Sequence, residues 1–288
     1  MDNDELSPIL HYIASATSIT IVVMGIIGNL LTFFAFAFDR NLRRFANLFI
    51  LNLAISDFFG AAISMPFQTY GIIMEKFENS ELCKFVAAVY YQTVFTSLLS
   101  ITFLGFNRYI FMFRNRFYRR IKGRYFGAPA VFFCWIIPFA LNIVPLFNLD
   151  THDQFTFSSK LLNCAYSRKI SRKVIDISVI LFELIPYGFN IFFYSSIILK
   201  VSQSNKRVSR AVSDTEGPTK LTLKENNQLA LTLFVIFILF FFCNMPFVVV
   251  NLVDVHDKCL DSKSLLCGVQ SGRDPVEKLL DIDFSYIR

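Results

Sequence analysis

The stretch that decides the fold is residues 85–113, FVAAVYYQTVFTSLLSITFLGFNRYIFMF, which carries a single charged side chain. A helix needs about 20 mostly apolar residues to cross about 30 Å of hydrocarbon, so this run is long enough to span a bilayer. Its charged residue, Arg108, lies near the end of the run. An arginine there either anchors the helix end by reaching the interface or takes part in function.

Six runs in the chain have this character, each with at most one Asp, Glu, Lys or Arg. The runs are continuous, whereas strands of a membrane barrel are about ten residues long and alternate in polarity. The hydrophobic content of 54%, with 35 phenylalanines in 288 residues, exceeds what a soluble domain could bury. The sequence therefore predicts an all-α polytopic helix bundle in the lipid bilayer, spanning residues 12–253. The six runs are 12–38, 45–74, 85–113, 125–149, 177–199 and 229–253.

Basic residues in the connections predict the orientation, because Lys and Arg accumulate on the cytoplasmic side. With residues 1–11 outside, the inner connections carry fifteen basic residues and the outer ones carry seven. The net charge of +6 follows from this topology and needs no nucleic-acid partner. After residue 253 no further run is long enough to span. We therefore expect residues 254–288 to form an extracellular tail, with no seventh helix.

Cysteine positions agree with this topology. Two of the six cysteines, Cys134 and Cys243, lie inside apolar runs, where a thiol behaves as a small hydrophobe. Four lie in outer segments, where an oxidising environment permits disulfides. A bond between the cysteines before the third run and before the fifth run would hold the outer loop over the mouth of the bundle; two free thiols are the alternative. The four outer cysteines are Cys83, Cys164, Cys259 and Cys267.

Only Asp57, Arg108 and Glu183 are ionisable within the predicted spans. Ionisable groups at membrane depth are costly, so they usually face the bundle interior and often have a function. Asp57 is too deep to reach the interface. It is either a protonated carboxyl group bonded to neighbouring helices, or a buried cation site or switch.

An ordered series of motifs crosses these runs: GNLLTFFAF in the first, NLFILNLAISD in the second, a cysteine before the third and NRY near its end. Trp135, then Pro186 with Tyr194, then Phe240 before CNMP continue the series. This series resembles the class A, rhodopsin-like G-protein-coupled receptors. Asn107 in place of an acid, and NNQLALTLFVIFILFFFC before and within the sixth run, are similar to the melatonin-receptor branch.

The resemblance implies a receptor in the plasma membrane that binds an extracellular small molecule and couples to a heterotrimeric G protein. No cofactor is expected beyond a sodium ion near the carboxylate of the second run. The implied residues form four groups. They are the disulfide Cys83–Cys164; the polar core Asn29, Asp57 and Ser97; the G-protein-facing switch Asn107, Arg108, Tyr109, Tyr194 and Phe117; and the packing switch Leu98, Pro186, Phe240, Asn244 and Pro246.

Some positions depart from the family pattern, and these differences change what is expected of the chain. Asn107 removes the charged partner next to Arg108, which predicts a loosely held inactive state. Asn244 stands where the family usually has a switching tryptophan. Tyr90 stands where amine receptors have an aspartate, which favours a neutral or amphipathic ligand in an aromatic pocket. The polar points expected in that pocket are Gln68, Tyr90, Tyr91, Glu183 and Asn251.

Two other functions are alternatives to a signalling receptor. A shortened form could associate with other receptor chains and regulate a full-length receptor without signalling itself. A transporter or channel would predict internal repeats, broken glycine-rich helices or an ion filter, and none is visible. No enzyme motif is present either, since the three histidines lie in separate segments without metal-ligand spacing.

Overall fold

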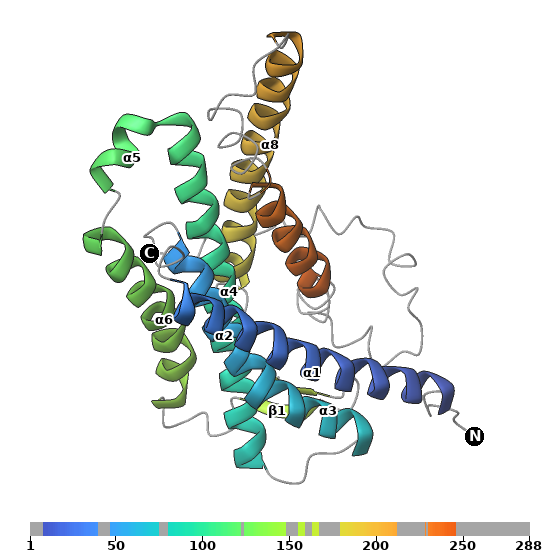
Figure 1. The fold of residues 1–288 in the computed structure, drawn as a ribbon. Helices are drawn as coiled ribbons and strands as arrows, with labels where there is room; N and C mark the ends of the chain where they lie inside the picture. Colours follow the sequence, from blue (N-terminus) through green and yellow to red (C-terminus); the bar gives the residue numbers. More distant parts are fainter. Residues whose placement is uncertain are drawn as a thin grey trace, which may run out of the picture. The chain divides into compact units, whose positions relative to one another are not determined.

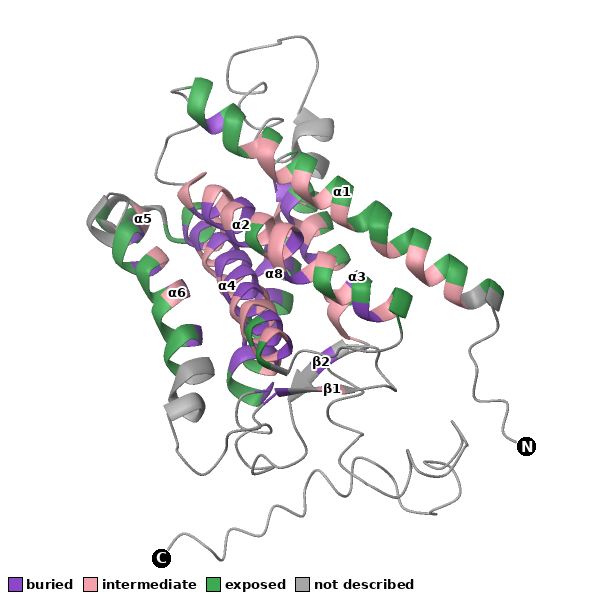
Figure 2. Ribbon diagram, turned by 90° about the horizontal axis from the view of Figure 1, so that it is seen from below, coloured by how far each residue is buried: buried purple, intermediate pink, exposed green. Residues whose placement is uncertain are grey.

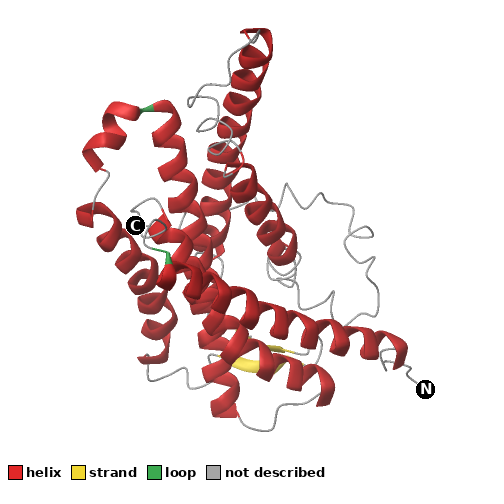
Figure 3. Cartoon of the chain, viewed as in Figure 1, coloured by secondary structure: helices red, strands yellow, loops and turns green. Residues whose placement is uncertain are grey.

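Helices make up most of the described chain in the computed structural model (Figures 1 and 3). The chain divides into two compact units, Met1–Phe241 and Phe242–Arg288, and the first contains nearly all of the described residues. The structure describes residues 8–39, 47–74, 80–121, 124–147, 155–158, 163–166, 179–211, 228 and 230–245. The predicted tail 254–288 and the end of the sixth run, with Pro246 and Asn251, lie outside these residues.

Each of the six apolar runs contains a helix, in agreement with the predicted helix bundle. Four segments are long and apolar enough to cross a membrane, and two shorter apolar helices, Gly127–Ala140 and Ala230–Met245, accompany them in the described residues. The labelled elements are α1 (Pro8–Phe38), α2 (Leu48–Phe59), η3 (Gly60–Ser64), α3 (Met65–Met74), α4 (Ser80–Phe113), α5 (Asn115–Ile121), α6 (Arg124–Phe147), η4 (Ile180–Leu184) and α8 (Ile185–Ala211).

Helix α4 is the centre of the bundle and packs against α2, α6 and α8. Figure 2 shows that α4 is mostly buried, whereas α1 is exposed along much of its length. This difference follows from position, because the main contacts of α1 among the described residues are with α2, η3 and α3 on one side of the bundle. The buried side chains of α4 include Val86, Ala87, Leu98, Ile101 and Leu104.

The outward faces of the helices are apolar as well. Large exposed side chains on α6 include Phe132, Phe133 and Phe139. Soluble proteins rarely expose so much contiguous apolar surface, whereas lipid tails favour it. These faces are therefore the lipid-contacting surface of the bundle.

Two widened turns lie in the described helices: η3 separates α2 from α3, and η4 leads into α8. The π-helical segment η3 ends just before Pro66, and η4 ends just before Pro186. Proline has no backbone N–H and its ring clashes with the preceding turn, so a wider turn accommodates it. The distortion expected of a proline within an apolar helix is present at Pro186 as a π-helical turn.

The described residues also include a small antiparallel hairpin and a short helix that the sequence analysis did not predict. Strand β1 (Phe155–Ser158) pairs with β2 (Asn163–Tyr166), and Phe157 lies opposite Cys164. Helix α5 follows α4 after a single residue. These elements are too short for a sequence period to reveal them.

A close approach between helices depends on Gly25 in α1. A Cβ atom at this position would lie 3.0 Å from Cβ of Ala61 in η3, which is tighter than most carbon contacts in proteins. Two hydrogen bonds join α1 to α3, the helix that continues η3: Ser18 Oγ to Thr69 Oγ1 at 2.6 Å, and His11 Nε2 to the Ile72 carbonyl at 2.9 Å. Small residues at such contacts let membrane helices pack by van der Waals attraction.

Gly25→Val should force α1 away from η3 and lower the free energy of unfolding by about 1–3 kcal/mol, the usual cost of overpacking. Gly28→Val is the matched control, because a Cβ atom there meets nothing within 4 Å. Thermal unfolding of the detergent-purified protein measures both. Equal changes in the two variants would mean that the close contact is unimportant.

Candidate functional site

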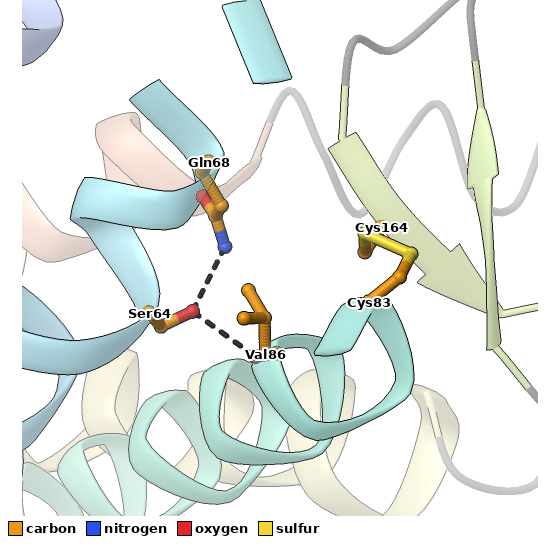
Figure 4. Close-up of a disulfide and its surroundings, with 5 residues drawn as sticks. All are labelled: Ser64, Gln68, Cys83, Val86 and Cys164. Atoms are coloured by element: carbon orange, nitrogen blue, oxygen red, sulfur yellow. Dashed lines mark hydrogen bonds between the residues drawn. A yellow bond between two sulfur atoms is a disulfide. The ribbon is translucent and has the colours of Figure 1, made fainter. Parts of the chain in front are cut away.

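A disulfide lies at the end of the bundle that the basic residues predict to be the outer one, and the opposite end is the predicted inner one. Cys83 at the start of α4 is joined to Cys164 in β2, as the family resemblance implies, and both cysteines are buried (Figure 4). The bond holds the hairpin against α4, where the ring of Phe155 in β1 stacks on Tyr91 at 5.8 Å. The β1–β2 hairpin therefore lies over the outer end of α4 and covers it.

Beneath this cover, aromatic rings form a continuous layer between α4 and η4. The rings of Tyr90 and Tyr91 are 5.3 Å apart, those of Tyr91 and Phe95 are 6.0 Å apart, and those of Phe95 and Phe182 are 5.4 Å apart. Glu183 follows Phe182 in η4 and is 4% exposed. Its Oε2 atom has no hydrogen-bond partner within the described part of the chain.

Gln68, another expected pocket residue, bonds to its own helical segment. Its Nε2 donates to Ser64 Oγ at 3.1 Å, and Ser64 in turn donates to the Val86 carbonyl of α4 at 3.1 Å (Figure 4). Gln68 therefore supports the contact between η3 and α4. A contact between Gln68 and a ligand remains a prediction.

The expected polar core is partly assembled. Ser97 Oγ in α4 lies 2.5 Å from Oδ1 of Asp57 in α2, and 2.8 Å from Ser56 Oγ. Asn29 donates instead to the Gly25 carbonyl of its own helix at 2.8 Å. The core thus joins α2 to α4 through hydroxyl groups and one carboxyl group.

A neighbouring network of neutral side chains was not predicted from the sequence, although Trp135 belongs to the motif series. Trp135 Nε1 of α6 donates to Asn52 Oδ1 of α2 at 2.8 Å, and Asn52 Nδ2 donates to Ser100 Oγ of α4 at 2.7 Å. Thr96 Oγ1 also donates to the Cys134 carbonyl at 3.0 Å. Three helices are therefore joined by side-chain hydrogen bonds at membrane depth. The presence of Asn52 and Trp135 within apolar runs was the sequence feature that could have indicated this network.

The inner end of α4 holds the residues expected to face a G protein. Both side-chain amide atoms of Asn107 and Nε of Arg108 are buried without hydrogen-bond partners among the described residues. Tyr194 of α8 stacks on Phe237 at 5.3 Å, and its hydroxyl donates to the Ile101 carbonyl at 3.4 Å. Tyr194 therefore packs between α4 and the helix Ala230–Met245.

The two aromatic residues expected on this face differ in burial. Tyr109 stacks on Phe113 of α4 at 4.7 Å and contacts Phe193 of α8 at 5.4 Å. Phe117, in α5, is exposed. Its exposure leaves this ring accessible on the segment that follows α4.

A second missed residue, Lys200 of α8, contacts the end of α4. Its Nζ donates to the Met112 carbonyl at 2.7 Å and lies 4.2 Å from the centre of the Phe113 ring. The carbonyl groups of the last helical turn lack internal partners, and a cation there also complements the helix dipole. Lys200 therefore caps α4 from a neighbouring helix.

The expected packing switch is also partly described. Leu98 and Pro186 are buried, and Phe240 lies 6.5 Å from the ring of Tyr187. One turn after Pro186, Asn190 Nδ2 donates to Thr102 Oγ1 of α4 at 2.8 Å. Asn244 is described at the end of its helix, but Pro246 falls outside the described residues.

These features define a multi-pass membrane protein built as a helix bundle, with a disulfide closing one end and an arginine near the other. Residues 28–270 match the model of the 7 transmembrane receptor (rhodopsin family). The chain belongs to this family of receptors, which is not a class of enzymes, and it is therefore a multi-pass protein of the plasma membrane.

Individual relatives agree with this assignment. The chain is 26% identical to "Protein trapped in endoderm-1" of Drosophila melanogaster over 84% of its length, covering 66% of that protein. It is 26% identical to Melatonin receptor type 1B-A of Danio rerio over 82% of its length, covering 79% of that receptor. It is 29% identical to the G-protein coupled receptor moody of Drosophila melanogaster over 53% of its length, covering only 22% of it. The similarity to melatonin receptors inferred from the sequence is confirmed.

Asn52→Leu should lower the free energy of unfolding by about 1–3 kcal/mol, because the Trp135 N–H loses its acceptor and Ser100 keeps only its bond to the Thr96 carbonyl. Trp135→Phe removes the N–H together with part of the ring. The double variant should cost less than the sum of the single ones, since the two share one hydrogen bond. Thermal unfolding in detergent provides the three values, and strictly additive costs would contradict the coupling.

Lys200→Met keeps an apolar stem against Phe113 but removes the charge that caps α4. We expect the free energy of unfolding to fall by about 1 kcal/mol. Lys84→Met is the control, because Lys84 pairs with the exposed Glu81 and such pairs contribute little. A larger loss for the control in thermal unfolding would refute the assigned role of Lys200.

Proposed function

We propose that the chain is a receptor that binds a small molecule on the outer side of the membrane and couples to a heterotrimeric G protein on the inner side. Its amino terminus faces outward, which the excess of basic residues in the inner connections supports. The observation that carries the proposal is Arg108, a charged residue near the inner end of the most buried helix of a receptor-family bundle.

Arg108 is suited to this role because of its chemistry. A guanidinium group is always charged and presents five fixed donors, so it needs acceptors in every state of the protein. Its Nε atom is buried without a partner in the part of the chain that the structure describes, and the amide of the adjacent Asn107 is also unpartnered. An arginine held in this way is available to donate to carbonyl groups of a G-protein helix. Tyr109 and the exposed Phe117 supply apolar contacts beside it.

The outer half supports ligand binding. A disulfide-held hairpin covers the aromatic layer formed by Tyr90, Tyr91 and Phe95, and a buried carboxyl group lies in the adjoining η4 segment. Apolar sites with a few polar groups are the usual form of small-molecule sites. The movement of Pro186 and Phe240 relative to Leu98 would connect this half to the inner end, with the π-helical turn before Pro186 as the pivot.

A sodium ion fits the polar core between these halves. Asp57 and the hydroxyl groups of Ser97 and Ser56 bring oxygen atoms together in the interior, and hard cations prefer oxygen ligands. A bound cation would offset the charge of the Asp57 carboxylate and hold α2 to α4. Ligand-induced movement of α4 would weaken this hold.

Arg108→Ala should abolish basal and ligand-stimulated nucleotide exchange on a G protein while leaving delivery to the cell surface intact. The physical reason is that the donors facing the G protein are lost, whereas the apolar packing of α4 is unchanged. The measurement is G-protein activation in cells, normalised to the amount of receptor at the surface.

Arg114→Ala is the matched control, since this exposed arginine just after α4 carries the same charge. We expect it to keep most of the activity. Unchanged exchange in Arg108→Ala would reduce that residue to an anchor of the helix end.

A further inference from the structure

We propose that Glu183 is the counter-ion for a ligand that carries a protonated amine, bound between α4 and η4. The inference rests on the proposed function, because it takes the outer half of the bundle as the ligand site. It names the chemical class of the ligand, which the motifs of the sequence do not.

The first argument is the burial of Glu183. Its side chain is 4% exposed and lies at membrane depth, where an unpaired charged or polar group is costly. Yet Oε2 has no hydrogen-bond partner among the described residues. Gln92 Oε1 and Asn190 Oδ1 are also buried without partners among these residues, but Glu183 contributes the one carboxyl group of this kind in the described part of the chain. A buried carboxyl oxygen without a partner is suited to a cationic partner from outside the chain.

The second argument is the set of rings around the carboxyl group. Phe182 adjoins Glu183 in the chain and contacts Phe95 of α4. Tyr90 of α4 and Tyr187 of α8 also lie near Glu183. Aromatic faces attract organic cations, and a desolvated ammonium group beside a ring is held more strongly than an exposed one. A carboxylate among aromatic rings is therefore a site for an aromatic or alkyl amine.

The third argument is the π-helical turn. Glu183 lies within η4, whose widened turn precedes Pro186. Such turns shift the side chains that follow relative to a regular helix, and they often occur at functional sites. Here the turn contributes both Phe182 and Glu183 to the buried face toward α4.

This inference revises the expectation of a neutral ligand. That expectation arose because Tyr90 occupies the position on α4 where amine receptors have a carboxylate. The structure shows a buried carboxyl group on the facing helix instead. A charge-assisted hydrogen bond from an ammonium group to Glu183 is about twice as strong as a neutral one, so an amine would bind with its charged end toward η4.

The test uses the full chain, purified in detergent, with tryptamine and phenethylamine as probes. Both carry an aromatic ring and a protonated amine, and their N-acetyl derivatives keep the ring but lose the charge. We expect each amine to raise the midpoint of thermal unfolding by about 5 °C at a saturating concentration. The N-acetyl derivatives should produce at most a small shift.

Glu183→Gln has the same size without the charge and should abolish the shift produced by the amines. Glu183→Asp keeps the charge on a shorter side chain and should weaken amine binding about tenfold. This variant tests the inference if Glu183→Gln fails to fold. Glu81→Gln is the matched control, because it makes the same chemical change at an exposed side chain. It should leave the shift intact.

The outcomes separate this inference from the proposed function. No shift with either amine in the wild type, or an equal shift in Glu183→Gln, overturns the inference. If G-protein activation by the wild-type chain nevertheless depends on Arg108, the proposed receptor function is supported although the inference about Glu183 is refuted. Amine binding lost in Glu183→Gln, with no G-protein activation, would support the ligand site and refute the coupling.

Discussion

Every buried polar group on α4 must find its partner inside the protein, because hydrocarbon offers none. The central position of this helix makes the requirement strict. Ser97 bonds toward Asp57, Ser100 accepts from Asn52, and Thr102 accepts from Asn190 of α8. These bonds determine which face of α4 meets α2 and which meets α8. Apolar packing alone would not distinguish these faces, since lipid tails are as apolar as leucine side chains.

Some buried polar groups have no partner inside the described part of the protein, and their positions are informative. In the described residues, Glu183 lies beside the outer aromatic layer, and Arg108 with Asn107 lies toward the inner end of α4. Gln92 Oε1 and Asn190 Oδ1 also lack a partner among the described residues. Unpaired buried groups cost stability, and ionisable ones cost the most. Glu183 and Arg108 are therefore the positions at which a ligand and a G protein are proposed to supply a partner.

The inner end shows how a lost interaction can be replaced. Asn107 cannot form an ion pair with Arg108, and the sequence alone therefore indicates a loosely held inactive state. The structure adds a different restraint, because Lys200 of α8 caps the end of α4 through Met112 and Phe113. This contact acts on the helix ends rather than on the arginine. Arg108 is thus left available while α4 and α8 stay together.

The sequence by itself determined the membrane bundle, the approximate spans and the family, because apolar runs of about 20 residues and ordered motifs are properties of consecutive residues. It also indicated Asp57, Arg108 and Glu183 as costly groups. Only the tertiary structure decided which of them are paired: Ser97 of α4 bonds to Asp57, whereas Arg108 Nε and Glu183 Oε2 have no partner among the described residues. The sequence period reports that a helix has a buried face, but the partner of that face depends on how the helices pack.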